Sequence, residues 1–217
     1  MRPDWEGIVR ALREHLRSSR LPSVSQIARE DRSPFRVLIS TMISLRTRDE
    51  VTHAASARLF AEADTPRAVG ALPVERVEEL IYPAGFYRTK ARNILEVCRI
   101  LVEQTDGKVP PDIERLTALP GVGRKTANLV LGLGFGTPAI CVDTHVHRIS
   151  NRCGWVATRT PDETEAELAS ILPRKHWIEI NELLVAYGQD VCTPASPRCS
   201  SCAITDRCRR VGVERSR

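Results

Sequence analysis

Hydrophobic residues recur along most of this chain at intervals of three and four residues, the spacing of a helix that buries one face. The N-terminal segment, entered at Pro3–Asp4, carries an apolar stripe formed by Trp5, Ile8, Val9, Leu12 and Leu16. No segment alternates apolar and polar residues as a half-buried strand does, and no repeat or low-complexity tract interrupts the helical pattern. The pattern therefore predicts an all-α protein.

Proline and small polar residues mark where several of these helices should begin. Ser33–Pro34 has the form of an N-cap followed by a first-turn proline, and an apolar face follows it. Thr65–Pro66 and Pro73–Val74 predict the starts of two shorter helices. Further helices are expected through residues 54–60, 89–102, 113–119, 143–152, 162–172 and 176–187.

A short turn, Leu119-Pro120-Gly121-Val122-Gly123, interrupts the helical pattern before it resumes through Ala127. Proline removes a backbone donor and glycine permits a positive φ, so the segment predicts helix–hairpin–helix. The free N–H groups at the start of the second helix form a ready site for an anion such as a DNA phosphate. Taken alone, the same residues also fit an ordinary tight turn with a solvated Arg124–Lys125 pair.

Lys125 directly follows this turn, and it is one of only four lysines among 32 basic residues. Arginine supplies positive charge almost everywhere else in the chain. An amine can lose its proton and attack a carbon, which a guanidinium cannot do. The choice of lysine here suggests covalent chemistry beside a phosphate-binding turn.

Asp143 follows the apolar run 138–142 and opens the next predicted helix, in Val142-Asp143-Thr144-His145. Its simplest role is an N-cap, which contributes roughly 1 kcal/mol to helix stability. A capping carboxylate that faces a cleft would also stay ionised, because N–H donors favour the charged form. Near Lys125 it could then stabilise a developing cation, although sequence spacing does not establish that the two residues meet.

Four cysteines near the C-terminus form the pattern C-x6-C-x2-C-x5-C: Cys192, Cys199, Cys202 and Cys208. With no secretion signal beside them, they indicate a metal site rather than disulfides. Structural zinc usually takes two close cysteine pairs, whereas thiolates alone also suit an iron–sulfur cluster, and the spacing leaves both open. The remaining cysteines, Cys98, Cys141 and Cys153, lie in apolar stretches and are expected to be buried thiols.

The whole-chain properties agree with a partner that is a polyanion. The formal net charge is +5 and the isoelectric point is near 9.0, which suits DNA without proving it. No apolar run approaches the roughly 18 residues of a membrane span. The start, Met1-Arg2-Pro3-Asp4, lacks an apolar signal region, so we expect a cytoplasmic, nucleoid-associated protein in a reducing compartment.

Together, the lysine-bearing hairpin, the Val-Asp-Thr-His segment and the cysteine tail resemble endonuclease III, in this order and from about Ser33 to Cys208. This family belongs to the helix–hairpin–helix DNA glycosylases of base-excision repair. The resemblance implies a two-domain fold, with a six-helix domain over residues 27–137 and a cluster domain formed by residues 1–26 and 138–217. It also implies a [4Fe-4S] cluster on the four cysteines and a monomer that acts on double-stranded DNA with damaged bases or abasic sites.

The implied activity is N-glycosylase action on oxidised pyrimidines, followed by AP lyase cleavage of the abasic strand. Lys125 matches the family's nucleophile and Asp143 its catalytic aspartate. A flipped base would leave the stack, Asp143 would stabilise the charge that develops on the sugar, and Lys125 would form a Schiff base. The matching positions expected to contact DNA are Gly121, Val122, Gly123, Arg124, Thr126 and His145.

Three further residues are expected to contact DNA, two at positions that depart from the family pattern and one in a loop that does. Arg46 stands where the pattern has glutamine, and Phe86 stands where leucine commonly wedges into the duplex. An aromatic wedge would still support a kink, while an arginine could favour guanine opposite the lesion or could contact a phosphate. In the loop between Cys192 and Cys199 only Arg198 is basic, where the family carries more positive charge.

Other members of the superfamily match these motifs less completely. The adenine-specific mismatch glycosylase usually lacks the lysine, a thymine-mismatch glycosylase replaces it, and the 8-oxoguanine glycosylases lack the cysteine quartet. A mismatch-specific or lesion-narrowed glycosylase is the alternative within the superfamily. A non-catalytic DNA-binding iron–sulfur module, in which Lys125 contacts a phosphate and Asp143 only caps, is the alternative from another class.

Overall fold

The computed structural model describes residues 3–17, 19 and 21–217. Within these ranges every regular element is a helix and no strand occurs, which confirms the predicted all-α class. The fold divides into two compact units, Ser23–Thr137 (the hairpin unit) and Met1–Pro22 with Pro138–Arg217 (the cysteine unit). The division after residue 22, rather than 26, follows from a helix that begins at Ser23 and belongs wholly to the hairpin unit.

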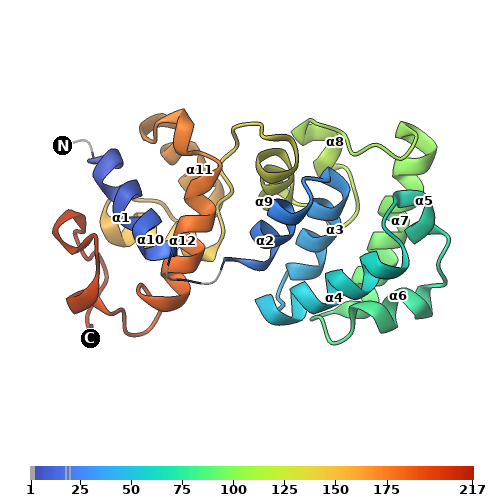
Figure 1. Cartoon of the computed structure of the whole chain (residues 1–217). Coiled ribbons are helices and arrows are strands. Elements are labelled where there is room, and N and C mark those ends of the chain that lie inside the picture. Colours follow the sequence, from blue (N-terminus) through green and yellow to red (C-terminus); the bar gives the residue numbers. More distant parts are fainter. Residues whose placement is uncertain (1–2, 18, 20) are drawn as a thin grey trace. The chain divides into compact units, whose positions relative to one another are not determined.

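The hairpin unit is built around one central helix, α3 (Figure 1). Helix α3 contacts α2, α4, α7, α9 and η1, and it buries residues on all sides, including Leu38, Ile39 and Ile43. The elements of this unit are α2 (Ser23–Glu30), α3 (Pro34–Ser44), α4 (Asp49–Glu62), α5 (Pro66–Gly70), α6 (Val74–Ile81), α7 (Tyr87–Thr105), α8 (Ile113–Thr117), α9 (Arg124–Leu129) and the π-helical segment η1 (Val130–Gly134).

Two helix starts in this unit have the caps that the sequence predicts. The Ser33 hydroxyl accepts a hydrogen bond from Arg36 N at 3.4 Å, and the Thr65 hydroxyl accepts one from Ala68 N at 3.1 Å. Each cap is followed by a proline in the first turn, which needs no hydrogen-bond partner there. Pro73 also occupies the N-cap position of α6, as predicted.

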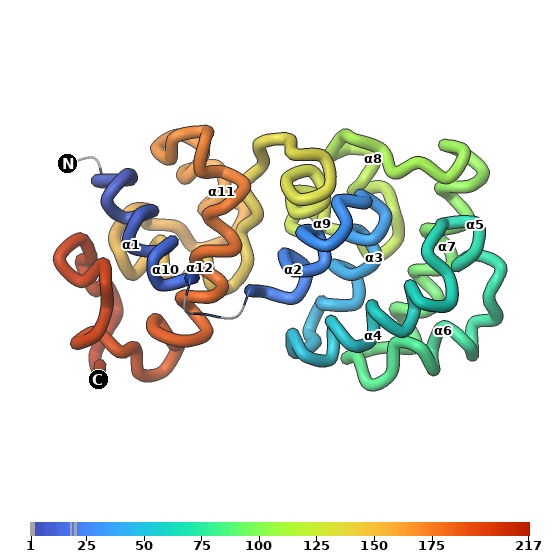
Figure 2. Tube along the Cα trace, in the orientation of Figure 1, coloured from blue at the N-terminus to red at the C-terminus, as the bar shows by residue number. Residues whose placement is uncertain are grey.

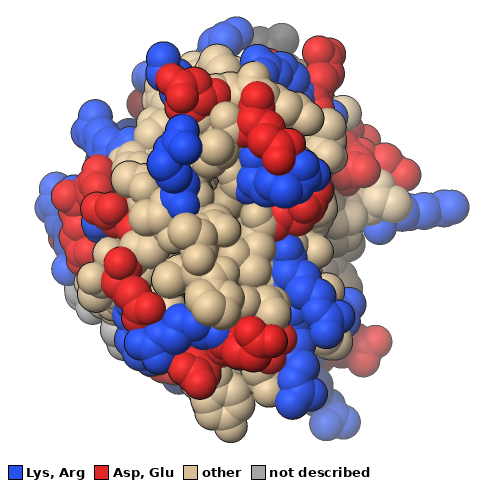
Figure 3. Space-filling view, turned by 90° about the vertical axis from the view of Figure 1, so that its right-hand side faces the viewer, with Lys and Arg blue, Asp and Glu red and all other residues tan. Residues whose placement is uncertain are grey.

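The surface of the hairpin unit around α5, α6 and α7 carries acidic and basic side chains intermingled (Figure 3). Arg76 pairs with Glu62 at 2.6 Å and with Glu79 at 2.8 Å, and Arg99 pairs with Glu96 and Glu103 on its own helix. The positive charge of these arginines is therefore balanced locally, and this face presents no continuous basic surface to a polyanion.

The cysteine unit packs the N-terminal helix against the C-terminal helices, and Figure 2 follows this path of the chain. Helix α1 contacts α12, and Trp5 meets Trp155 edge to face at 5.0 Å between ring centroids. The elements are α1 (Trp5–Arg17), α10 (Thr144–Cys153), α11 (Pro161–Ile171), α12 (Glu179–Asp190) and the 3₁₀ segments η2 (Arg174–His176), η3 (Cys199–Ser201) and η4 (Thr205–Arg207).

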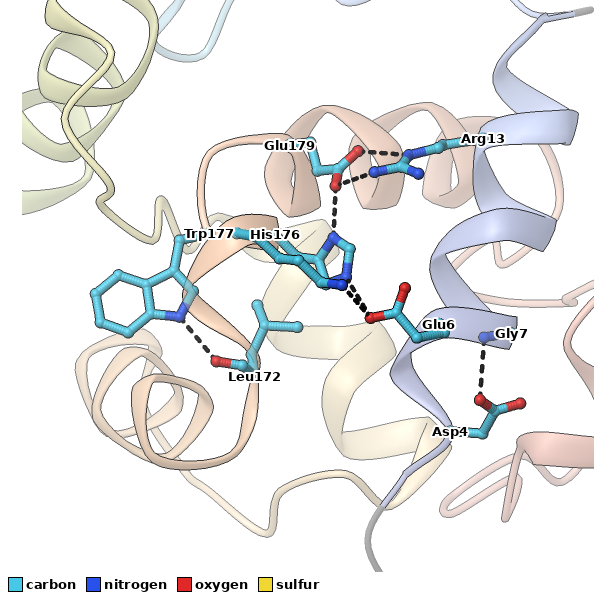
Figure 4. A network of polar contacts seen from close by, with 9 residues as sticks. Asp4, Glu6, Gly7, Arg13, Leu172, His176, Trp177 and Glu179 are labelled. Atoms are coloured by element: carbon cyan, nitrogen blue, oxygen red, sulfur yellow. Dashed lines mark hydrogen bonds and ion pairs between the residues drawn. The ribbon is translucent and has the colours of Figure 1, made fainter.

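A polar network centred on His176 joins α1 to the start of α12 (Figure 4). The ring of His176 is only 2% exposed; Nδ1 lies 2.7 Å from Glu179 Oε1, and Nε2 lies 3.3 Å from Glu6 Oε1. Arg13 of α1 also pairs with Glu179 at 2.7 Å. The network ties the first helix to residues far along the chain, so α1 is an integral part of this unit. None of the described helices is both long and apolar enough to cross a membrane.

Candidate functional site

The segment between α8 and α9 forms the predicted hairpin. Helix α8 ends at Thr117, the Val122 N–H donates to Leu119 O at 3.1 Å, and Gly123 is the N-cap of α9. Gly121 has φ +76°, a conformation that glycine adopts without strain. A Cβ atom at Gly123 would meet nothing within 4 Å, so open space lies beside the backbone at the start of α9.

Lys125 is the second residue of α9 and is half-buried, while Arg124 before it is exposed. Thr126 and Val122 have buried side chains, at 2% and 5% exposure. Their side chains therefore pack inside the hairpin unit, and only their backbone could meet a ligand. Contact of these two residues with DNA stays a prediction, and it would involve their backbone atoms.

Asp143 is the N-cap of α10 in the cysteine unit. Its Oδ1 atom accepts hydrogen bonds from His145 N at 2.8 Å and from Val146 N at 2.9 Å. The side chain is half-buried. The capping role considered from the sequence is thus present, and it leaves the residue with an acceptor fixed at the helix N-terminus, where the dipole favours a negative charge.

His145 is held between two helices of the cysteine unit. Its Nδ1 atom lies 3.2 Å from an Arg148 guanidinium nitrogen, and a Cβ atom on Gly188 would come within 2.4 Å of the same Nδ1. Glycine at position 188 therefore lets α12 approach α10 at this point. Arg148 also donates to Gly188 O and Cys192 O. These bonds connect α10 to the beginning of residues 192–199 (the cysteine loop).

Arg46 and Phe86, two positions where the sequence departs from the family pattern, lie together in the hairpin unit. Both side chains are exposed, Phe86 at 64%. The guanidinium carbon of Arg46 lies 5.5 Å from the centroid of the Phe86 ring, within the range of a cation–π contact. An exposed aromatic ring stacked with an arginine, on loops that leave α3 and α6, is an arrangement suited to contact bases.

The four C-terminal cysteines line a single cavity. Cys192, Cys199, Cys202 and Cys208 all border it. No three His, Cys, Asp or Glu residues of the described ranges form a set that could hold a single metal ion. A [4Fe-4S] cluster has a different requirement, because each of its four cysteines binds a different iron. All seven cysteines are unbridged in the structure. The buried positions expected for Cys98, Cys141 and Cys153 are confirmed.

Hydrogen-bond donors point at the sulfur atoms of this cavity. Tyr187 Oη donates to Cys202 Sγ at 3.2 Å, Arg152 to Cys192 Sγ at 3.6 Å and Arg210 N to Cys208 Sγ at 3.4 Å. Donors of this kind stabilise thiolates, and the hydrogen bond from Cys153 is the main cause that lowers the pKa of Cys208 to about 6. The donor set fits a group bound by thiolates. Sequence reasoning missed Arg152 and Tyr187, because both lie far along the chain from the sulfurs they contact.

Arg198 borders the same cavity, and its side chain is half-exposed. It forms an ion pair with Asp190 at 3.0 Å. A phosphate would compete with this carboxylate for the guanidinium. Sequence spacing alone does not reveal the ion pair.

Comparisons with known proteins agree with these features. The model of the HhH-GPD superfamily base excision DNA repair proteins matches residues 39–174. The chain is 51% identical to endonuclease III of Thermotoga maritima over 82% of this chain and 84% of that protein. It is 42% identical to endonuclease III of Escherichia coli over 81% of this chain and 83% of that protein. A solved structure of a trapped endonuclease III–DNA covalent intermediate is 40% identical, with a TM-score of 0.77 over 82% of this chain and 84% of that one.

The fold and the hairpin thus define a base excision DNA repair protein of the helix–hairpin–helix class. Within that class, the chain belongs to the endonuclease III family. It is accordingly an enzyme, a bifunctional DNA glycosylase with lyase activity at abasic sites. The mismatch-specific and non-catalytic alternatives are not favoured.

Proposed function

We propose that this chain removes oxidised pyrimidines from double-stranded DNA and cuts the resulting abasic strand through a Schiff base on Lys125. The observation that carries the proposal is the position of Lys125, in the first turn of α9 and directly after a hairpin with exposed glycines. The relatives named endonuclease III and the trapped DNA complex of one of them support DNA as the substrate.

The hairpin would bind the DNA backbone. The N-terminus of a helix is a general binding position for anions, because its first N–H groups point outward along the axis and the positive end of the helix dipole lies there. Gly121 and Gly123 bring no side chain between these groups and a phosphate, and Arg124 is exposed beside them. Such contacts position the protein on the duplex without reading its sequence.

Base loss would depend on Asp143. As the bond between the sugar C1′ and the base nitrogen breaks, the electron pair leaves with the base and positive charge develops on the sugar. The ionised carboxylate, held in place by the His145 and Val146 N–H groups, would stabilise that charge.

Lys125 would then form the covalent intermediate. The neutral Nζ attacks C1′. The C1′–O4′ bond then breaks while a proton passes from the nitrogen to O4′, which becomes the hydroxyl on C4′, and a protonated imine joins Nζ and C1′. This imine acidifies the proton on C2′. When a base removes that proton, the electrons expel the 3′ phosphate and cut the strand. Hydrolysis of the imine would release Lys125.

Arg46 and Phe86 would act on the partner base while the damaged nucleotide leaves the stack. Extrusion of a base has a free-energy cost of a few kcal/mol, which an inserted side chain can offset by filling the gap. Phe86 is the exposed aromatic wedge, and Arg46 offers donors that match the acceptors of guanine. His145 and Arg198 are the further DNA contacts that we propose in the cysteine unit.

The four thiols of the C-terminal cavity would hold a [4Fe-4S] cluster. The support is the donor set, with four cysteines around one cavity and hydrogen bonds directed at three of the sulfurs. When bound, the cluster would cross-link residues 192–208 and fix the loop that carries Arg198. Iron and sulfide analysis of the purified protein, with its visible absorbance, distinguishes this cluster from zinc.

We further infer a monomer that works on damaged or abasic duplex DNA in the cytoplasm, at the nucleoid. Seven unbridged cysteines suit a reducing compartment. The proposed function is tested with duplexes that each contain one lesion, assayed separately for base release and for strand cleavage. Release of oxidised pyrimidines followed by cleavage is the expected result, and release confined to mismatched normal bases would contradict it.

A further inference from the structure

Arg46 and Phe86 share an unusual backbone conformation. Their φ angles are 52° and 57°, in the left-handed region that residues with a Cβ atom seldom adopt. Such conformations persist only where the surrounding structure holds them, and they concentrate at functional sites. Arg46 and Phe86 lie on two loops, residues 45–48 (the Arg46 loop) and residues 82–86 (the Phe86 loop).

Lys90, in the first turns of α7, binds both loops. Its backbone N–H donates to Phe86 O at 3.0 Å. Its Nζ atom donates to Ile43 O at 2.6 Å, to Leu45 O at 2.6 Å and to the Thr47 hydroxyl at 2.8 Å. The three bonds use all three donors of an ammonium group, and they satisfy carbonyl oxygens that the end of α3 leaves without helical partners.

Thr47 completes the connection between the loops. Its hydroxyl accepts from Lys90 Nζ and from Gly85 N, at 2.8 Å and 3.0 Å, and donates to Leu45 O at 3.2 Å. One hydroxyl thus uses its donor and both acceptor positions. The backbones are also close, because a Cβ atom on Gly85 would lie 2.4 Å from Arg46 O. Figure 2 shows the α3–α4 and α6–α7 connections side by side.

Burial of the charged Lys90 side chain has a desolvation free-energy cost. The side chain is buried at 7% exposure, and burial lowers the pKa of Lys90 to about 8. A leucine or methionine would fill the same volume without that desolvation. A buried ammonium group that is fully hydrogen-bonded to the end of α3 and the Arg46 loop is therefore better explained by the geometry it imposes than by packing.

We propose that Lys90, acting through Thr47, is a positioning residue that locks the Arg46 and Phe86 loops together, so that both side chains enter DNA as one preassembled pair. The inference rests on the proposed DNA role of these two residues. Because the pair is already stacked in the free protein, no side chain needs to be ordered when the base is extruded.

Thr47→Val tests this link, with Thr47→Ser as its matched control. Valine has nearly the shape of threonine but lacks the hydroxyl, whereas serine keeps it. Single-turnover base release from a duplex with one oxidised pyrimidine is expected to fall about tenfold to hundredfold in Thr47→Val. Thr47→Ser should stay close to wild type. Borohydride trapping on a single-stranded abasic oligonucleotide, which has no partner base to replace, should be equal in all three proteins.

A double-mutant cycle shows whether the effect passes through the wedge. In a Phe86→Ala background, Thr47→Val is expected to cause little further loss of duplex base release. Lys90→Met should repeat the Thr47→Val pattern, and the threonine pair carries the test if that variant does not fold. The inference is overturned by equal base release from the valine and serine variants, by fully additive losses, or by a matching loss on the single strand.

Failure of the proposed chemistry has a different signature. If wild-type protein yields no borohydride adduct, the Schiff-base role of Lys125 fails, while duplex base release still reports the effect of Thr47. If Phe86→Ala releases the base from duplex DNA at the wild-type rate, the wedge role fails and this inference fails with it.

Discussion

Asp143 Oδ1 accepts a 2.8 Å hydrogen bond from the backbone N–H of His145, so the carboxylate proposed to act on DNA is also the N-cap of α10. These two roles have different chemical requirements. A cap needs an oxygen acceptor, whereas stabilisation of a cationic sugar needs a negative charge. Asparagine keeps the acceptor and removes the charge, which allows the roles to be measured separately.

We predict that Asp143→Asn folds with nearly the wild-type free energy of unfolding but loses base release by about 10²–10³-fold. Asp143→Ala should show the same loss of base release and should also be destabilised by about 1 kcal/mol. Urea denaturation and single-turnover excision measure the two effects. Near-wild-type excision by Asp143→Asn would assign this residue to capping alone.

Arg46 is predicted to set a preference for guanine opposite the lesion. Its guanidinium only donates hydrogen bonds, and guanine offers two acceptors on one edge. Excision rates measured with each of the four bases opposite one lesion should rank guanine first, and Arg46→Gln should flatten that ranking. The readout idea fails if the wild type has no preference or if the substitution leaves the preference unchanged, as expected of an arginine that binds only a phosphate.

Arg198 is predicted to contact a DNA phosphate. Arg198→Ala should weaken binding to every duplex. It should also reduce the slope of log affinity against log salt concentration by about 1, the value for one lost phosphate contact. Asp190→Asn provides the matched control, because it removes the ion pair that competes with a phosphate and leaves Arg198 intact. That variant should bind at least as tightly as wild type. An unchanged salt slope in Arg198→Ala would contradict the proposed phosphate contact.

The His176 network predicts how stability responds to acid (Figure 4). Burial raises the pKa of Glu179, but hydrogen bonds from Arg13 and His176 outweigh it and lower that pKa below 4.5. A lowered carboxylate pKa means that the contribution to stability is present above the unfolded pKa, and is lost as pH falls through the folded value.

Glu179→Gln should therefore unfold at lower urea concentration than wild type at pH 7, by about 1–3 kcal/mol for lost hydrogen bonds to a charged group. The gap between the two proteins should close as the pH falls below the ordinary glutamate pKa and through the lowered pKa of Glu179. Glu214→Gln, which changes an exposed carboxylate of the same unit, controls for a general change in net charge. A gap that stays constant over this pH range would contradict the assignment.

The sequence predicts those parts of the fold that depend on local chemistry. Proline after a small hydroxyl residue marks the starts of α3 and α5, and the glycines of the hairpin mark the break before α9. Helix α2 is not predicted, because its eight residues carry no cap signal and its apolar residues bury against α3 and α4. Helix α7 starts at Tyr87, two residues before the predicted start, after the left-handed Phe86.

The sequence likewise predicts only those residues of the candidate site that belong to local motifs. Lys125, Asp143 and the cysteine quartet are visible as motifs, since each lies beside a turn or within a short spacing. Lys90 and Thr47 are not visible, because their roles depend on two loops that meet only in the folded chain. The pairing of Arg198 with Asp190 likewise depends on how the cysteine loop folds back on α12.

The central claim is that Lys125 forms a covalent bond with the abasic sugar, and borohydride trapping on an abasic duplex measures that bond directly. Wild-type protein and Lys108→Gln should both yield a covalent protein–DNA adduct. The second protein lacks a different lysine, which is exposed. Folded Lys125→Gln should yield none. An adduct that persists in Lys125→Gln, or its absence from folded wild-type protein with its iron bound, would contradict the account.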